Sequence, residues 1–298
     1  MEKYTIEKGL FYNVFYIGKR KVFSPQKELK EFQKKILSII KEKYKIKLNL
    51  KSTAEIHCNQ KWILKMDIKD FYWSVPSNEI KKVIQEIFGK FDFQNRYSTK
   101  IIYKYCTVGD RLPVGAITSA HLANICFFDI DEKIYFFCKK NKINYSRYMD
   151  DLFFSCSDKK KLNKVEKFVR QTLEEHSYKI NEEKVHYISD NKRQEILGVV
   201  VNNREVKISN LNKREYRSLF FNYLKSIFLE ERLGVAHLFH KKINFDIVNG
   251  HLSYVKTTDY AFYKSMISYI KRNIVKFSIQ KNEEVKKLMK ILKITKVV

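Results

Sequence analysis

The sequence predicts an α+β fold, in which a body of mixed strands and helices is followed by an all-helical, basic C-terminal part. Up to about residue 205, runs of alternating apolar residues are interleaved with runs that carry apolar residues three and four apart. Residues 206–298 have the pattern of helices, and they hold 19 Lys and Arg against 7 Asp and Glu. The chain has only 8 Gly and 3 Pro and no linker-like stretch, so we expect one compact unit with lobes.

The individual elements follow from these two periods. Alternating runs rich in β-branched and aromatic residues predict strands at residues 12–25 (with a basic turn at 18–21), 62–68, 101–107 and 194–201. Helical spacing predicts helices at residues 28–43, 77–88 (with Ser77 as N-cap), 119–139, 160–176, 211–231 and 260–293. Two short apolar runs in residues 143–157 flank Met149, Asp150 and Asp151, which predicts a hairpin with an acidic turn.

The composition favours a polyanionic partner and disfavours a membrane protein. The formal net charge is +26, which is typical of nucleic-acid-binding proteins, although a Lys-rich coding bias would also produce it. No apolar run reaches the roughly 18 residues of a membrane span, and the N-terminus has no apolar signal segment. The five cysteines form no C-x-x-C pair, so we expect neither a zinc knuckle nor a redox motif, and a cytoplasmic location.

Three carboxylates are candidates for metal binding. Asp67 ends the predicted strand 62–68, where a buried carboxylate needs a partner, and the alternative is a cap for the next helix. Asp150 and Asp151 are adjacent at the predicted hairpin tip, where their repulsion favours a bound cation, and the alternative is a solvated turn. If the strand and the hairpin are neighbours in one sheet, the three carboxylates would hold two Mg²⁺ ions about 3.5–4 Å apart, the arrangement used by polymerases. Mn²⁺ remains open as the alternative metal.

Five short motifs occur in order along residues 12–202. They are R-K-V-F-S-P from Arg20, D-I-K-D-F-Y from Asp67, L-P-V-G-A-I-T-S-A from Leu112, Y-M-D-D from Tyr148 and N-E-E-K from Asn181. The set resembles the reverse transcriptase family, in particular its bacterial retron and group II intron branch, and five ordered motifs are far more specific than the Y-x-D-D box alone. The resemblance implies a right-hand polymerase. Residues 1–205 would form fingers and palm (an antiparallel sheet flanked by helices, the palm roughly 60–88 and 105–205), and residues 206–298 a helical thumb.

The resemblance also implies roles for single residues at the acidic cluster. Asp67 and Asp150 match the catalytic, metal-binding aspartates of the family. Asp151 matches the third, less tightly engaged aspartate, and Ile68 is included in the metal-binding set. The cofactor implied is a pair of Mg²⁺ ions.

Further residues match positions that contact the incoming nucleotide. Arg20 would contact the triphosphate, and Tyr72 would be an aromatic gate that excludes a ribose 2′-hydroxyl. Val114 and Gly115 would allow a close backbone approach, and Lys184 would act as a general acid for pyrophosphate. The alternatives are a solvated basic turn for Arg20, core packing for Tyr72 and an ordinary surface lysine for Lys184.

Two segments resemble signatures of the retron branch. T-A-E-I-H, from Thr53 to His57, resembles N-A-x-x-H, and Q-E-I-L-G-V-V-V-N, with Gly198 inside it and Asn202 at its end, resembles Q-x-V-T-G-x-x-V-N. We therefore expect Thr53, His57, Gly198 and Asn202 to take part in RNA recognition, with a structural role as the alternative for His57. Thr53 replaces an Asn and Leu197 a Thr, which leaves the RNA specificity open.

The function implied by the resemblance is that of a retron RNA-directed DNA polymerase. It would extend a primer on a structured noncoding RNA with dNTPs, make a branched RNA–DNA hybrid (msDNA), and act in anti-phage defence with a toxin or effector protein. One alternative is another bacterial defence reverse transcriptase, of the abortive-infection or group II-like type, protein-primed or untemplated. The other is a catalytically dead RNA-binding scaffold, against which the clustered carboxylates argue.

Overall fold

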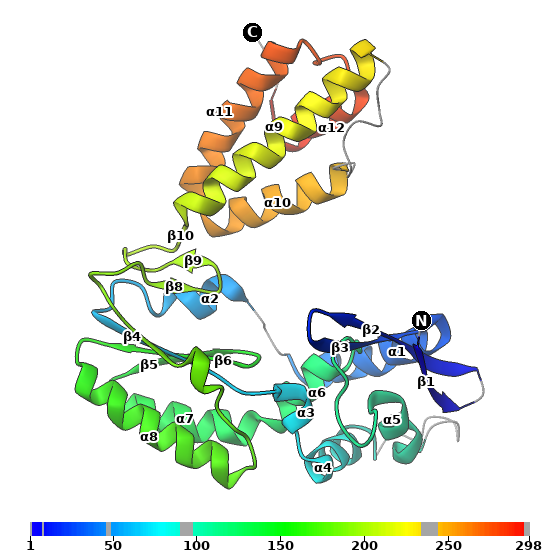
Figure 1. The fold of residues 1–298 in the computed structure, drawn as a ribbon, viewed down its shortest axis with the longest axis vertical. Helices are drawn as coiled ribbons and strands as arrows, with labels where there is room; N and C mark the ends of the chain where they lie inside the picture. The colour runs from blue at the N-terminus through cyan, green and yellow to red at the C-terminus, as the bar shows by residue number, and fades with distance from the viewer. Residues whose placement is uncertain (1, 8, 46–48, 90–97, 234–243, 295–298) are drawn as a thin grey trace. The chain divides into compact units, whose positions relative to one another are not determined.

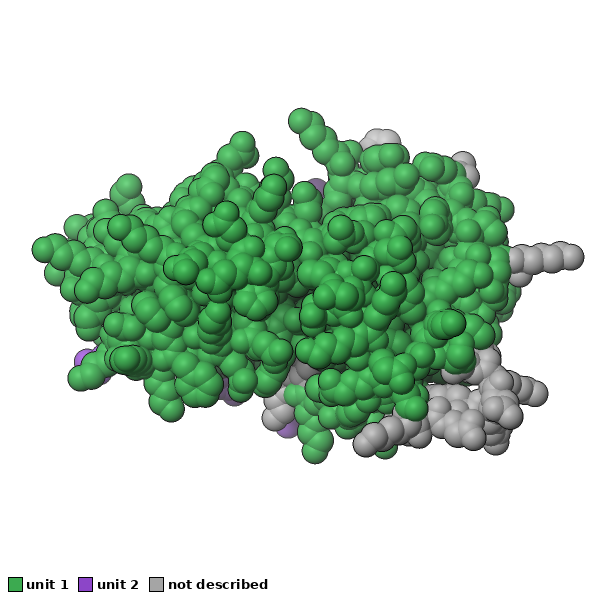
Figure 2. Space-filling model, turned by 90° about the horizontal axis from the view of Figure 1, so that it is seen from below, with its two compact units in different colours: residues 1–192 green, residues 193–298 purple. Residues whose placement is uncertain are grey.

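The computed structural model describes residues 2–7, 9–45, 49–89, 98–233 and 244–294, and it falls into two compact units (Figure 1). The first is Met1–Lys192 and the second is Arg193–Val298, drawn in green and purple in Figure 2. The division precedes the helical part because three short strands pair with one another inside the second unit. The predicted domain limits, 1–205 and 206–298, stay a proposal.

A four-stranded antiparallel sheet organises the first unit. Its order is β5 (Asn144–Tyr148), β6 (Asp151–Cys156), β4 (Trp62–Asp67) and β7 (His186–Ser189), and helices α7 (Phe128–Lys140) and α8 (Lys159–Glu175) lie along it (Figure 1). The face toward these helices carries buried apolar side chains such as Met66 and Leu152. Successive side chains of a strand point to opposite sides, so the other face carries Lys65, Asp67 and Asp151. The sheet therefore has an apolar face and a face with polar groups at one end.

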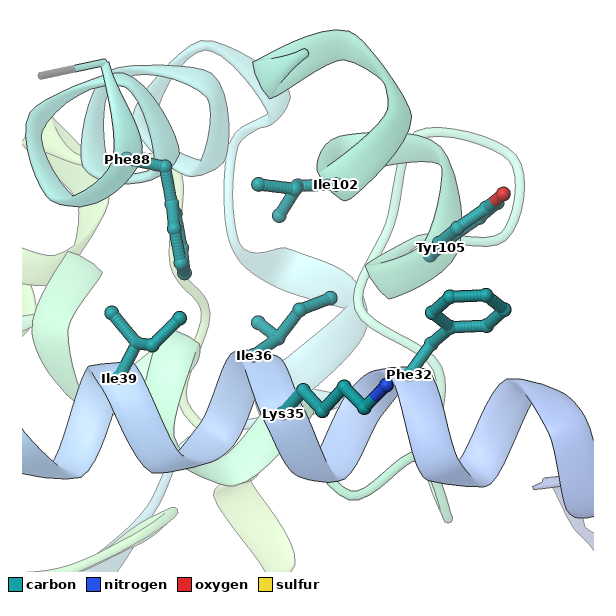
Figure 3. A pocket seen from close by; sticks show the side chains of 7 residues that line it. All are labelled: Phe32, Lys35, Ile36, Ile39, Phe88, Ile102 and Tyr105. Atoms are coloured by element: carbon teal, nitrogen blue, oxygen red, sulfur yellow. The ribbon is translucent and has the colours of Figure 1, made fainter. Parts of the chain in front are cut away.

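The rest of the first unit is a three-stranded sheet with further helices. The strands are β1 (Glu2–Glu7), β2 (Leu10–Ile17) and β3 (Arg20–Pro25), and the helices are α1 (Lys27–Lys43), α2 (Leu50–Glu55), α3 (Phe71–Ser74), α4 (Ser77–Phe88), α5 (Thr99–Cys106), α6 (Ser119–Cys126) and the 3₁₀ turn η1 (Glu182–Lys184). The strands predicted at 12–25 are confirmed as β2 and β3. Helices α1, α4 and α5 line a small apolar hollow with Ile36, Phe88 and Ile102 (Figure 3), which lies apart from the polar sheet face.

The strand predicted at residues 101–107 is wrong, because this segment is helix α5. Its buried residues are Ile102, Tyr105 and Cys106, which are three and four apart and so share one face of a helix. The β-branched and aromatic composition favoured a strand. Packing against α1 and α4 decides the outcome, since composition alone is a weak guide to strands.

Two helical predictions need smaller corrections. The helix predicted at 119–139 is interrupted at the buried Phe127, where α6 ends and α7 begins. Helix α6 packs on α3 and α4, whereas α7 packs on β5 and α8, and one straight helix does not follow both sets of neighbours. The N-cap of α4 is Pro76 rather than Ser77. Proline has no backbone N–H, and it is tolerated at the start of a helix because an N–H there would have no partner within the helix.

The second unit joins a small antiparallel sheet to a group of helices. Its elements are β8 (Glu195–Ile196), β9 (Val199–Val200), β10 (Lys207–Ile208), α9 (Asn210–Leu233), α10 (Phe245–Thr258), α11 (Tyr260–Phe277) and α12 (Glu283–Ile291). The strand predicted at 194–201 is a hairpin, turned at Leu197 and Gly198, which both have positive φ as a two-residue type I′ turn requires. Residues 260–293 form two helices that are separated after Ser278, whose φ is 54°. Among the described residues, no helix combines the length and the apolar character needed to cross a bilayer.

Asp259 joins β10 to the start of α11 in this unit. It is 5% exposed, and its carboxylate accepts hydrogen bonds from the Ile208 N–H at 3.2 Å and the Phe262 N–H at 3.0 Å. Lys213 forms an ion pair with it at 2.9 Å. Burial by itself raises the pKa of Asp259, but these donors lower the pKa overall. The buried carboxylate is thus fully engaged, which is the condition under which it stabilises the fold.

Candidate active site

Three carboxylates meet at one end of the central sheet. Asp67 is the last residue of β4 and Asp151 the first of β6, and they stand directly opposite each other in the register. Their Cβ atoms are therefore about 5 Å apart on the same face. Asp150 lies in the turn between β5 and β6, and its carbonyl accepts a 2.9 Å hydrogen bond from the Ile68 N–H. The structure brings together the four residues of the predicted metal-binding set, and their roles stay proposals.

The cluster crowds negative charge into a partly buried site. Asp67 is 4% exposed. Burial raises the pKa of Asp151 to about 6, and the charges of Asp150 and Asp67 add to the rise. Burial is also the main cause of the raised pKa of Asp150, with Asp67 as a further cause. A raised pKa means that the charged form is disfavoured, so a cation in the cluster would stabilise it.

Lys184 supplies one such cation. Its ammonium donates a 2.7 Å hydrogen bond to the Asp67 carboxylate, which raises the pKa of Lys184. The backbone also holds this segment against β4, because the Asn181 N–H donates to the Asp67 carbonyl at 2.8 Å and Ile68 bridges to Ile180. The partner of Lys184 in this structure is thus a carboxylate of the cluster, and its action on a nucleotide stays a proposal.

The donor set fits a hard divalent cation. Carboxylate oxygens are the ligands that Mg²⁺ and Mn²⁺ prefer, and burial together with the charge of neighbouring carboxylates raises the pKa values of Asp150 and Asp151. Within the described ranges, no group of three or more His, Cys, Asp or Glu side chains is arranged so that it could by itself hold a metal ion. An ion here would therefore complete its shell with water and phosphate oxygens, as Mg²⁺ commonly does.

Tyr72 and Arg20 border the cluster from two other elements. Tyr72 lies in α3, just after Asp70, whose φ of 50° turns the chain away from β4. Burial raises the pKa of the half-buried Tyr72, Asp150 raises it further, and the positive charge of Arg20 opposes the rise. Arg20 is exposed at the start of β3, next to the turn at Gly18. Both predicted nucleotide-binding side chains are thus within electrostatic reach of the cluster.

Val114 and Gly115 are held against β3. The Val114 carbonyl accepts a 2.7 Å hydrogen bond from the Phe23 N–H. Gly115 has φ of 103°, and a Cβ there would stand 2.8 Å from the Phe23 carbonyl oxygen and 2.8 Å from Val22 Cγ1. The backbone that closely approaches Gly115 is therefore that of β3. Contact of either residue with a nucleotide stays a proposal.

We expect Gly115→Ala to destabilise the protein by about 2–4 kcal/mol, because alanine adds a clash with backbone atoms at a positive φ. Urea unfolding measures the loss. Gly109→Ala is the matched control, since Gly109 also has a positive φ (55°) but its added Cβ would meet nothing within 4 Å. The control should lose only about 1 kcal/mol, from the backbone conformation alone. Equal losses at both positions would contradict the clash.

Arg147 organises the acidic hairpin, although the sequence prediction does not include it. Its side chain is 9% exposed and pairs with Asp131 of α7, with Nε 2.9 Å from both carboxylate oxygens. Nη1 donates to Asn124 Oδ1 at 2.6 Å and to the Met149 carbonyl at 2.8 Å. The guanidinium also lies 4.7 Å from the centre of the Phe127 ring, a favourable cation–π distance. In the sequence, Arg147 is only a charged residue within a predicted strand. Its role becomes visible once its partners are known.

The turn that carries Asp150 depends on an uncommon backbone conformation. Met149 has φ of 57°, in the left-handed region that costs a non-glycine residue roughly 1–2 kcal/mol. The hydrogen bond from Arg147 to the Met149 carbonyl offsets this cost, and Asn124 Nδ2 approaches the Met149 sulfur at 3.4 Å. Side chains outside the turn thus fix its shape, and with it the position of Asp150.

His57 is fully buried on the polar side of the sheet. Its Nδ1 lies 2.7 Å from Ser155 Oγ and its Nε2 lies 2.8 Å from Ser146 Oγ. Ser146 donates its only hydroxyl proton to the Thr53 carbonyl at 3.0 Å, so it accepts from Nε2–H, and Nδ1 accepts from Ser155. A neutral histidine therefore ties α2 to β5 and β6. The His57 side chain has no accessible surface, which favours the structural alternative, and its part in RNA recognition stays a proposal.

The burial of His57 predicts a pH dependence of stability. Burial lowers the pKa of His57 to about 3, whereas an unfolded histidine has a pKa near 6.5. Between these values only the unfolded chain binds the proton, so stability falls as the pH drops below about 6.5 and stops falling below about 3. From pH 8 to pH 5 we expect His57 to account for a loss of about 2 kcal/mol.

Urea unfolding of the wild type and of His57→Gln at pH 8 and pH 5 checks this dependence. The variant should be less stable at pH 8, because two hydrogen bonds change, yet it should lose about 2 kcal/mol less on acidification. An identical loss in both proteins would show that His57 does not cause the pH dependence.

Gly198 and Asn202 close the β8–β9 hairpin of the second unit. Asn202 Oδ1 accepts a 2.7 Å hydrogen bond from the Gln194 N–H, and the Gly198 carbonyl accepts a 3.4 Å hydrogen bond from Asn212 Nδ2. Leu197 beside them has φ of 49°, which is costly for leucine. Both predicted RNA-recognition residues thus have a structural reason for their identity, and RNA recognition by them stays a proposal.

The family comparison matches more than half of the chain. Residues 18–201 match the family described as reverse transcriptase (RNA-dependent DNA polymerase). The chain is 25% identical over 265 residues to the retron Ec86 reverse transcriptase of Escherichia coli, covering 85% of this chain and 76% of that protein. It is 29% identical over 231 residues to the retron Ec83 reverse transcriptase of the same species, covering 70% and 72%.

A solved structure gives an independent view of the fold. The chain resembles telomerase from Candida albicans, determined in complex with a TWJ fragment of telomeric RNA, with a TM-score of 0.52 and 14% identity. The alignment covers 96% of this chain and 66% of that one. At this identity the likeness shows the fold alone, and it confirms the predicted α+β, right-hand polymerase class.

Proposed function

The chain belongs to the reverse transcriptase family, and from that premise we propose that it is the RNA-directed DNA polymerase of a bacterial retron. It extends a primer on a structured noncoding RNA with dNTPs and makes a branched RNA–DNA hybrid, msDNA. Similarity to retron reverse transcriptases over most of the chain supports the retron type. The observation that carries the chemistry is the direct opposition of Asp67 and Asp151, with Asp150 beside them, at one end of the sheet.

In this proposal Asp67, Asp150 and Asp151, with Ile68 beside them, hold two Mg²⁺ ions, or Mn²⁺ in their place. Divalent ions bound there would activate the primer hydroxyl and neutralise the phosphate charge. The three carboxylates would hold these ions at one end of the paired strands β4 and β6. Lys184 lies close enough to the cluster to give a proton to the leaving pyrophosphate once it releases Asp67.

Arg20, Tyr72, Val114 and Gly115 then surround the incoming nucleotide. Arg20 is the exposed cation on the β3 side of the cluster and suits the triphosphate. Tyr72, half-buried and near Asp150, supplies the aromatic ring that would contact the sugar of a dNTP. The backbone at Val114 and Gly115 is fixed against β3, so it would form a fixed surface against which the nucleotide packs.

We expect Tyr72→Ala to admit ribonucleotides, because removal of the ring opens the space next to the sugar C2′. Discrimination between dGTP and GTP should fall on the order of 100-fold, while dGTP incorporation changes much less. Single-nucleotide primer extension measures both rates. Tyr72→Phe keeps the ring and should keep the discrimination, and a Tyr72→Ala variant that still rejects GTP would mean that Tyr72 serves core packing only.

The proposed function is tested by the nucleic acid that the protein makes in cells that carry its native locus. The protein and an Asp150→Ala/Asp151→Ala double variant are purified, and the bound nucleic acid is treated with RNase or DNase. A defined RNA joined to DNA through a 2′,5′ branch, absent from the variant, is the expected result. DNA attached to the protein would indicate a protein-primed defence enzyme, and identical nucleic acid in both preparations would indicate a scaffold.

The proposal extends to the setting of the enzyme. A retron enzyme would act in anti-phage defence together with a toxin or effector protein. Cys106, Cys126, Cys138 and Cys156 are free thiols, three of them buried, and such thiols suit the reducing cytoplasm. Co-purification of the locus-encoded proteins with the tagged chain tests for the effector.

A further inference from the structure

A second concave site in the first unit lies outside the acidic cluster and is lined by cations. It is an open hollow with a volume of about 590 Å³, and Lys69, Arg111 and Lys179 line it from three separate segments. Asp70 is the one acidic residue among those that line it, and Trp73 adds an aromatic wall. Asp67, Asp150 and Asp151 do not line this hollow, so it is distinct from the candidate metal site. Three positive groups against one negative group favour an anionic ligand.

The backbone brings two of these cations together. Lys69 follows Asp67 by two residues, and its N–H donates a 2.8 Å hydrogen bond to the Lys179 carbonyl. Both lysine side chains belong to exposed residues, so their ammonium groups are available to a ligand. Arg111 Nη1 donates to the Val75 carbonyl at 3.3 Å, which anchors the guanidinium at the wall of the hollow. The pocket is therefore built by the fold beside the strand end that carries Asp67.

The start of α4 forms another wall of the pocket. Ser77 and Asn78 open this 12-residue helix, and no side chain caps it because Pro76 is the N-cap residue. The first N–H groups of a helix lack partners within the helix and carry a partial positive charge, which suits phosphate oxygens. The helix end and the three cations thus act on the same hollow, and together they favour a ligand with several negative charges.

The arrangement favours a compact oligophosphate over a nucleic-acid strand. A strand presents its phosphates one after another and is matched by a basic track, whereas these cationic residues line one hollow. We propose that this pocket binds pyrophosphate, and the oligophosphate part of related compounds, as a holding site for the product released beside Asp67. The source of the pyrophosphate rests on the proposed function, whereas the binding site itself rests on the pocket.

Calorimetric titration of the full chain with sodium pyrophosphate in EDTA tests the site. Saturable binding is expected, and Lys69→Gln and Lys179→Gln should each weaken it about tenfold, the effect of losing one charge-assisted contact. The matched control is Lys140→Gln/Lys164→Gln, which removes two exposed lysines of α7 and α8 that do not line the pocket. This control should change the affinity by no more than about twofold, through long-range charge alone.

Two further arms separate this site from the metal site and from RNA. Asp150→Asn loses polymerisation under the proposed function but should keep pyrophosphate binding. The polymerase proposal and the pyrophosphate-site proposal can therefore fail independently. The lysine variants should bind a short single-stranded RNA as the control variant does. The proposal is overturned by the absence of saturable binding, by equal weakening in the control, or by lysine variants that lose RNA but keep pyrophosphate.

Discussion

Asp150→Asn is expected to lose primer extension by about 10³-fold or more while the protein still binds its template. Asparagine has the same shape as aspartate but no charge, so it removes a ligand that the cluster needs to hold divalent cations. Single-turnover extension of an RNA-templated primer measures the loss, and a filter-binding assay measures the template. Asp129→Asn is the matched control, because Asp129 is an exposed carboxylate on α7, and it should extend primers at the wild-type rate.

The same variant gives a second readout that does not depend on activity. Asp150 adds to the charge repulsion that raises the pKa of Asp151, so its neutralisation should leave the metal-free protein as stable as the wild type or more stable. Mg²⁺ should raise the melting temperature of the wild type, because it binds the folded state only, and should raise that of the variant much less. A variant that extends primers normally, or that gains full stability from Mg²⁺, would remove Asp150 from the metal site.

Arg147→Met is expected to cost about 3–5 kcal/mol of stability and most of the activity. The variant removes the ion-pair partner of the partly buried Asp131 and the donor to the Met149 carbonyl, so the acidic turn loses its support. Urea unfolding measures the stability, and the Mg²⁺ dependence of primer extension reports the geometry of the turn. Loss of support should raise the Mg²⁺ concentration needed for half-maximal rate.

A second arginine provides the control for this prediction. Arg170 also pairs with two carboxylates, Glu166 and Glu182, but its side chain is 33% exposed. Solvent screening reduces the value of such pairs, so Arg170→Met should cost less than about 1.5 kcal/mol. In addition, Arg147→Met/Asp131→Asn should recover part of the stability, because no charge is then left unpaired. If both arginine variants lose the same stability, burial of the Arg147 pair is not the cause.

Patterns that extend over a few residues predicted the elements that carry the cluster. The strand at 62–68 and the acidic hairpin at 143–157 were readable because alternation and turn composition are local properties. Their neighbourhood in one sheet followed from the family motifs as much as from the pattern. The segment 101–107 failed because its composition and its burial period disagree, and only its packing partners decide between them.

Residues whose role depends on distant partners could not be predicted in this way. A charged residue within a strand, such as Arg147, is explained only by its partners Asp131 and Asn124. Gly115 resembles a glycine kept small for a ligand, and its clash with β3 is visible only in three dimensions. His57 belongs to a motif that is suggestive of RNA recognition, yet its two serine partners place it in the interior.

The order of the central sheet has a consequence for synthesis on the ribosome. Strand β4 is made first, and both of its neighbours come much later in the chain: β6 at Asp151–Cys156 and β7 at His186–Ser189. Contacts between distant segments form slowly, and an unpaired strand edge invites pairing with other chains. The nascent protein therefore exposes both edges of β4 until the hairpin emerges, and one edge until β7 does. Truncations that end between β6 and β7 leave that edge open, which makes them prone to aggregate rather than to yield a smaller folded enzyme.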